Sequence, residues 1–146
     1  MAPFRLTFEY ELLTPAGTAQ AGKAVSVIVP AQDGQVGVLA GRAPLAAVID
    51  AGVLTVERDT GRRDRFYVAN GFAQVREGRM TVVAEECTPT GQLNAESAAM
   101  ELARAQQPGI AGLDPPARAQ LMRAAKLKLK LAQREPRDQP ATDRET

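Results

Sequence analysis

The sequence predicts an all-β sandwich of about ten antiparallel strands followed by a C-terminal α-helical hairpin. Two observations lead to this fold class. Apolar and polar residues alternate over residues 1–90, whereas later Ala, Leu and charged residues recur at spacings of three to four. Alternation places apolar side chains on one face of a strand, and the longer spacing is typical of an amphipathic helix. We therefore expect a β-sandwich domain over 1–90, an antiparallel two-helix domain over 91–135 and a disordered tail over 136–146.

The strand predictions follow from alternation bounded by turn residues. The first strand, over 4–12, is the clearest, because its apolar residues alternate with charged and hydroxyl residues. Asn70-Gly71 and Glu77-Gly78 are dipeptides typical of turns. The further strands are expected at 18–21, 24–29, 36–39, 45–49, 53–58, 63–69, 72–76 and 80–85. So many short strands in so short a segment indicate a sandwich or barrel.

Two helices are expected after Pro89 and Gly91. Asn94 is a suitable N-cap for the first helix, and the segment 107–109 ends it. Asp114 caps the second helix, in which a proline is acceptable at the first position. The apolar stripe of the first helix is predicted to be Ala95, Ala98, Ala99, Leu102 and Ala103. The apolar side of the second is predicted to be Ala117, Leu121, Ala124, Ala125 and Ala132.

Composition excludes several classes of function. The 146 residues contain no His, so His-based catalysis and His-containing metal sites are excluded, and we expect neither a metal nor a cofactor. The net charge of +1 gives no reason to expect nucleic-acid binding. No secretory signal and no apolar run of about 20 residues is evident. The single Cys87 cannot form an internal disulfide, which suits a reducing cytoplasm.

The segment 33–45 is the most specific feature of the chain. Its three glycines suit a loop that needs positive φ angles or close backbone approach. It is not a phosphate-binding loop, because no Gly-Lys-Ser/Thr sequence follows. Two interpretations stay open, a long structural loop of the sandwich and a loop that contacts a partner. The candidate contact residues are Asp33, Gly34, Gln35, Val36, Gly37, Gly41, Arg42, Ala43 and Pro44.

The second predicted helix is basic. Its cations are Arg118, Arg123, Lys126, Lys128, Lys130 and Arg134. One interpretation is a solvated basic outer face with one exposed leucine, Leu129. The other is a helix that meets different surfaces in different states and offers its basic side to an acidic partner. A further cluster, Arg62, Arg63 and Arg65, is either a solvated turn or a site for an anion or partner.

Several motifs resemble the epsilon subunit of bacterial F-type ATP synthases. The segment 33–45 is similar to that family's Glu-Gly-x-x-Gly-x-Leu-Pro-Gly-His-Ala-Pro-Leu loop, and Gly52-Val53 to its Pro-Gly-Val/Met segment. The segment 70–75 looks like its Gly-Gly-Phe/Ile-x-Glu-Val strand, and 82–86 like its Val-Leu-Ala-Glu/Asp segment. The likeness runs in order from residue 4 to about residue 92, whereas the helical part matches only in kind.

The resemblance implies a ten-stranded sandwich with a helical hairpin, and a rotor subunit of the central stalk that couples ion translocation to ATP synthesis. It implies contact with the gamma subunit through the sandwich and with the c-subunit ring through 33–45. It also implies that the helical tail can reach the alpha and beta catalytic subunits and inhibit ATP hydrolysis. The chain would lie at the cytoplasmic face of the bacterial inner membrane, as a peripheral protein held there only by the complex.

The chain departs from the family pattern in the contact loop, where Gln35 stands at a commonly acidic position, and in the helical part. Arg42 replaces the usual His, which gives the contact loop a permanent charge. The family's ATP-binding Leu/Ile-Asp-x-x-Arg-Ala motif corresponds to Leu93, Asn94, Ser97 and Ala98 in their order here. Since its acidic and basic positions are both lost, we expect no tight nucleotide binding.

The sequence therefore predicts a non-catalytic subunit of a rotary ATP synthase. The alternative is a β-sandwich module that binds a small ligand or carbohydrate, although the absence of Trp and the presence of only two Tyr count against it. An enzyme is the least favoured class, because no nucleophile–base pair is evident.

Overall fold

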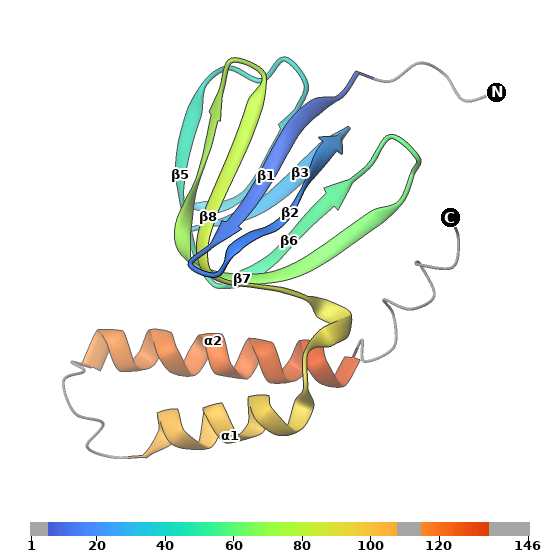
Figure 1. Ribbon diagram of the computed structural model, residues 1–146. Coiled ribbons are helices and arrows are strands. Elements are labelled where there is room, and N and C mark those ends of the chain that lie inside the picture. The colour runs from blue at the N-terminus through green and yellow to red at the C-terminus, as the bar shows by residue number, and fades with distance from the viewer. Residues whose placement is uncertain (1–5, 108–114, 135–146) are drawn as a thin grey trace. The chain divides into compact units, whose positions relative to one another are not determined.

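The computed structural model describes residues 6–107 and 115–134, and the predicted sandwich followed by a helical hairpin is confirmed (Figure 1). The chain divides into two compact units, Met1–Thr88 and Pro89–Thr146. The strands of the first unit are β1 (Phe8–Thr14), β2 (Gly17–Ala24), β3 (Ser26–Ala31), β4 (Gly34–Leu39), β5 (Leu45–Ile49), β6 (Gly52–Glu57), β7 (Arg63–Arg76) and β8 (Arg79–Pro89). The second unit contains the 3-10 turn η1 (Thr90–Gln92) and the helices α1 (Ala95–Gln106) and α2 (Pro115–Arg134).

The strands are hydrogen-bonded in the order β2-β1-β8-β7-β5-β3-β4, and β6 pairs with both β3 and β7. The long strand β7 connects the layers, because its first half pairs with β6 and its second half with β5. Gly52 lies opposite Val68 in the first ladder, and Ile49 lies opposite Gly71 in the second. This shared strand closes the structure into a sandwich around one core.

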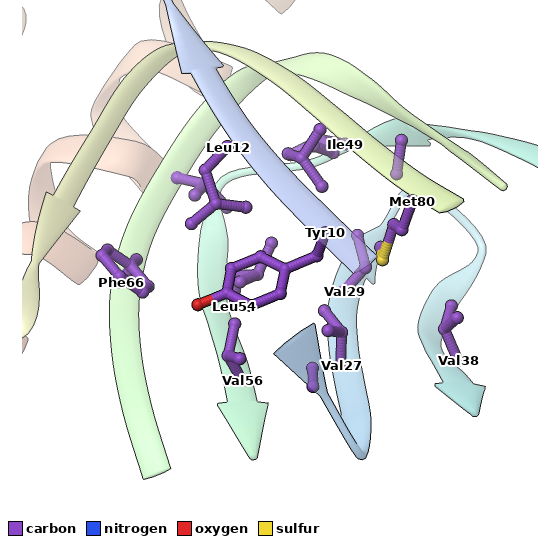
Figure 2. Packing of buried hydrophobic residues seen from close by; sticks show 14 of the residues in the cluster. Tyr10, Leu12, Val27, Val29, Val38, Ile49, Leu54, Val56, Phe66 and Met80 are labelled. Carbon is purple, nitrogen blue, oxygen red and sulfur yellow. The ribbon is translucent and has the colours of Figure 1, made fainter. Parts of the chain in front are cut away.

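The core of the sandwich is built from alternate residues of these strands, as their pattern predicts (Figure 2). Tyr10, Leu12, Leu54 and Met80 are among its largest fully buried side chains. Each such side chain stabilises the fold by roughly 1.5–3 kcal/mol through burial. Valines fill most of the space between them, which compensates for the shortage of aromatic residues.

The prediction of a wholly antiparallel sandwich is wrong at one ladder. Strand β1 pairs with β8 in parallel, with Glu9 opposite Arg79 and Leu13 opposite Val83. A parallel pair needs a long connection between its strands. Here the whole of β2–β7 forms that connection, which local turn signals do not reveal.

The prediction of a turn at Asn70-Gly71 is also wrong. The two strands expected at 63–69 and 72–76 form one continuous strand, β7, so the described residues hold eight strands rather than about ten. Asn70 has a φ of 61°, which bends the strand where its partner changes from β6 to β5. A Cβ on Gly71 would overlap the carbonyl oxygen of Val83, so glycine permits close approach to β8 there rather than chain reversal.

Two other local predictions are settled at the strand ends. The turn at Glu77-Gly78 is confirmed, with φ angles of 52° and 76° between β7 and β8. The first strand begins at Phe8 rather than Phe4, which lies outside the described residues. Leu6 precedes β1 and is 66% exposed. The alternation of apolar and polar residues therefore begins in the sequence before the first residue of the strand.

Helix α1 begins as predicted, because the Asn94 side chain accepts a hydrogen bond from the Ser97 N–H. Its predicted apolar stripe is only partly correct. Ala98 and Ala105 are buried, whereas Ala95, Ala99 and Ala103 are exposed. The buried seam follows a seven-residue spacing through 98 and 105, and the exposed Ala95, Ala99 and Ala103 lie about 60–140° of helix rotation from Ala98.

Helix α2 runs antiparallel beside α1 (Figure 1). Its predicted cap, Asp114, and the predicted tail over 136–146 lie outside the described residues. Leu121 was expected on the apolar side but is 44% exposed. Leu129, which one of the two interpretations left exposed, is half-buried. The buried residues of this helix are Ala125, Lys128, Leu131 and Ala132.

Candidate functional site

The candidate contact segment contains a strand, as the expected strand at 36–39 indicated, but the strand is longer and spans Gly34–Leu39. Asp33 lies in the tight turn of a hairpin in which Ala31 pairs with Gly34. Residues 34–39 form strand β4, and a second turn follows, where the Arg42 N–H donates to the Leu39 carbonyl over 3.1 Å. Gly34 and Gly41 have φ angles of 117° and 84°, so both glycines serve these turns.

The two turns lie at opposite ends of β4, about 17 Å apart for a strand of this length. Asp33, Gly34 and Gln35 are exposed at one end, and Val36 and Gly37 continue along the strand. The other end carries an exposed group, which consists of Gly41, Arg42, Ala43 and Pro44. A partner that contacts all the predicted residues must therefore lie along β4, which ends the strand order and leaves one edge unpaired.

An exposed apolar pair on the outer face of the sandwich was missed by the sequence analysis. Val48 on β5 lies directly opposite Phe72 on β7, and the two side chains are 52% and 46% exposed. Their chain neighbours Ile49 and Ala73 point into the core. The signal was present, because residues 45–49 are apolar at every position and such runs are typical of strands covered on both faces.

The six predicted basic residues of α2 do not form one outer face. Arg123, Lys126 and Lys130 are exposed, and helix geometry places them within an arc of about 60°. Lys128 is buried, which contradicts its predicted place on the outer face. Arg134 ends the helix, but the surroundings of its side chain lie outside the described residues.

Arg118 and Lys128 instead bind α1. The Arg118 Nη2 donates to the carbonyl oxygens of Gln106 and Gln107 over 2.9 and 3.0 Å. The Lys128 Nζ lies 2.8 Å from Glu101 Oε1. Glu101 was not predicted as a site residue. It lies three residues after Ala98 and four before Ala105, which places it beside these buried alanines, and its side chain is 48% exposed.

The segment that corresponds to the family's nucleotide motif opens helix α1. The Asn94 carboxamide caps the helix, Leu93 is half-buried and Ala98 is in the seam. Ser97 contributes its backbone N–H to the cap. These roles are structural, and the absence of nucleotide binding stays a prediction.

Of the predicted cluster Arg62, Arg63 and Arg65, Arg62 contacts the Asp64 carboxylate, and Arg58 contacts it as well. Asp64 forms ion pairs with Arg58 and Arg62 at 2.8 and 3.2 Å, and it accepts a hydrogen bond from Gln20 Nε2. The contact with Arg58 is electrostatic, because the Arg58 Nε–H makes no hydrogen bond there. The same Gln20 amide contacts the Tyr10 hydroxyl at 2.6 Å. These contacts hold the hairpin between β6 and β7 to β1 and β2, which supports a structural role.

No catalytic or metal-binding arrangement is evident in the described ranges. No group of three or more metal-ligating side chains occurs among residues 6–107 and 115–134. Burial raises the pKa of the Cys87 thiol to about 11, which suppresses its reactive thiolate. Neither described helix has the length and apolar character needed to cross a membrane.

Comparison with known proteins identifies the family. Residues 7–90 match the family model described as ATP synthase, Delta/Epsilon chain, beta-sandwich domain. The ATP synthase epsilon chain of Paramagnetospirillum magneticum is 39% identical over 90 residues, which cover 62% of this chain and 68% of that one. The epsilon chain of Rhodopseudomonas palustris is 37% identical over 108 residues, which cover 73% and 79% of the two chains.

Solved structures share the fold. A chain in the Euglena gracilis mitochondrial ATP synthase structure, which comprises OSCP, F1 and the c-ring, matches 96% of this chain and 84% of its own length. The TM-score is 0.66 at 20% identity. A chain of the Tetrahymena thermophila central stalk and c-ring gives a TM-score of 0.61 at 14% identity, covering 92% and 99% of the two chains. The relatives support the predicted role of a non-catalytic rotor subunit. The chain therefore belongs to the ATP synthase delta/epsilon chain family.

Proposed function

We propose that this chain is a rotor subunit that docks on the gamma subunit through its sandwich and on the c-subunit ring along β4. It lies at the cytoplasmic face of the bacterial inner membrane and associates with the membrane only through the complex. The family match over the whole sandwich is the observation that carries this proposal. The fold supports it as well, because the described residues offer exposed contact surfaces along β4 and on β5 and β7.

The outer pair Val48 and Phe72 is the proposed gamma contact. Large apolar side chains that are about half exposed on a rigid sheet are typical of interfaces. We expect the double change Val48→Asp and Phe72→Asp to reduce co-purification with gamma at least about tenfold. Leu6→Asp is the matched control, because Leu6 is exposed and apolar but lies outside the strands. Full recovery of gamma with the double variant would contradict this contact.

The turn at Arg42 is the proposed contact with the c-subunit ring. Its guanidinium is exposed beside Ala43 and Pro44 and offers a planar set of donors. We expect Arg42→Glu to lower ion pumping per ATP hydrolysed in membrane vesicles. Arg63→Glu serves as the control, because Arg63 is exposed on the β6–β7 hairpin. Equal coupling in both variants would exclude this part of the proposal.

The helical hairpin is the proposed inhibitory element. Its exposed cations Arg123, Lys126 and Lys130 suit acidic segments of the alpha and beta catalytic subunits. We expect truncation after Gln92 to raise ATPase activity of the assembled enzyme. The full-length triple variant Arg123→Gln, Lys126→Gln and Lys130→Gln is the matched variant, because it keeps the hairpin and removes only these charges. Unchanged ATPase activity after truncation would remove inhibition from the proposed function.

A further inference from the structure

The hairpin of α1 and α2 has a weak apolar seam. The buried residues of α1 are the alanines Ala98 and Ala105, and the buried apolar residues of α2 are Ala125, Leu131 and Ala132. An alanine contributes one methyl group, and burial of a group of that size is worth only about 0.8 kcal/mol. Helix α1 has 12 residues, and isolated helices of about 12–15 residues are marginal in water. The closed hairpin therefore depends strongly on other contacts between its helices.

Two polar contacts supply that connection. Arg118 reaches the carboxyl end of α1, where carbonyl oxygens have no partner within the helix. Its guanidinium neutralises the partial negative charge at that helix end. Lys128 pairs with Glu101 beside the seam, where the Lys128 side chain is 9% exposed and the Glu101 side chain is 48% exposed. Loss of the Glu101 charge would remove an attraction between the two helices at a largely buried ammonium, which weakens the closed hairpin.

We propose that the basic residues of α2 are divided into two groups with different tasks. Arg118 and Lys128 are a latch that keeps α1 and α2 together. Arg123, Lys126 and Lys130 stay exposed and remain available to a partner while the hairpin is closed. The relevance of the latch to ATP hydrolysis rests on the proposed function, whereas the latch itself belongs to the chain alone.

Opening of the latch changes the charge that α2 presents. Arg118 and Lys128 then join the three cations that are exposed in the closed hairpin. An acidic protein surface gains contacts with these two residues only in the open state. Such a surface shifts the equilibrium towards opening, because its interaction energy differs between the states. The acidic surface that the three exposed cations attract is therefore also the surface that favours release of Arg118 and Lys128 from α1.

The test compares Lys128→Glu with Lys126→Glu in the full-length chain. Both changes reverse one charge two residues apart on α2, but only Lys128 contacts Glu101. We expect hydrogen exchange of the α1 amides to be at least about tenfold faster in Lys128→Glu. In Lys126→Glu it should stay within about twofold of the original chain. The double variant Glu101→Lys with Lys128→Glu should recover most of the protection.

Equal exchange in Lys128→Glu and Lys126→Glu, or no recovery in the double variant, would overturn the ion-pair part of the latch. The pair Arg118→Gln and Arg123→Gln tests the other contact, with about fivefold faster exchange expected only for Arg118→Gln. If Lys128→Glu fails to fold, the sandwich amides lose protection as well, and the Arg118 pair decides. ATPase activity of the assembled enzyme is a separate readout. Faster exchange with unchanged activity supports the latch and contradicts the inhibitory role.

Discussion

The sandwich and the helical hairpin are stabilised in different ways. The sandwich has a continuous core of large buried side chains, with Tyr10, Leu12 and Leu54 among them. The hairpin has a smaller apolar seam of four alanines and Leu131, which is supplemented by the Lys128–Glu101 ion pair and by Arg118 at the end of α1. Apolar burial persists in any aqueous buffer, whereas polar contacts can be exchanged for contacts with a partner. The comparison indicates that the sandwich stays folded under all these conditions, whereas the stability of the helical hairpin depends on whether a partner competes for its polar contacts.

The largest effect is expected at the close approach of β7 and β8. A Cβ at position 71 would overlap the Val83 carbonyl oxygen and lie 2.7 Å from Ala84 Cα. We expect Gly71→Ala to lower the free energy of unfolding of the sandwich by about 4 kcal/mol. Urea unfolding followed by tyrosine fluorescence measures it, because Tyr10 and Tyr67 both lie in the sandwich. Gly37→Ala is the control, since nothing lies within 4 Å of its Cβ position.

A cavity in the sandwich core should have the next largest effect. Leu54 is fully buried, so Leu54→Ala should cost about 3 kcal/mol of unfolding free energy in the same urea assay. Leu121→Ala in α2 removes the same atoms from a side chain that is 44% exposed, and the loss should stay below about 1 kcal/mol. Comparable losses of unfolding free energy at both positions would contradict the difference between the sandwich and the helical hairpin.

The cap of α1 should contribute an intermediate amount. Asn94→Ala removes the acceptor of the Ser97 N–H, which should destabilise α1 by about 1 kcal/mol. Hydrogen exchange in the first turn of α1 reports this loss, and the sandwich amides should be unaffected. The neighbouring change Gln92→Ala serves as the control, because Gln92 is exposed and lies outside α1. A loss that spreads to the sandwich would show that the two units are more strongly coupled than the comparison implies.

The smallest effect should be a gain of stability. Glu77 has a φ of 52° in the turn between β7 and β8, a conformation that Asn adopts more readily than Glu. We expect Glu77→Asn to stabilise the sandwich by roughly 0.5 kcal/mol, because Asn-Gly is the preferred pair for such hairpins. The urea midpoint should rise without a change in slope. A lower midpoint would mean that the Glu77 side chain stabilises the turn.

Local patterns were sufficient for most of the elements. Alternation in the strands, the Asn94 cap and the Glu77-Gly78 turn were all predicted from neighbouring residues, and the structure confirms them. The candidate site was predicted less well. A short strand at 36–39 was expected inside the segment 33–45, but residues 34–39 all pair with β3 and separate two turns. That pairing depends on a register between strands, and residue spacing alone does not reveal it.

The sequence by itself determined that a glycine-punctuated β unit precedes two amphipathic helices, because periodicity is a property of neighbouring residues. Only the tertiary structure decided that β1 and β8 run parallel, that Asn70-Gly71 bends a strand rather than ending it, and that Lys128 faces Glu101. Each of these features depends on the proximity of segments far apart in the chain. Propensity and spacing describe one segment at a time, whereas packing selects which segments meet.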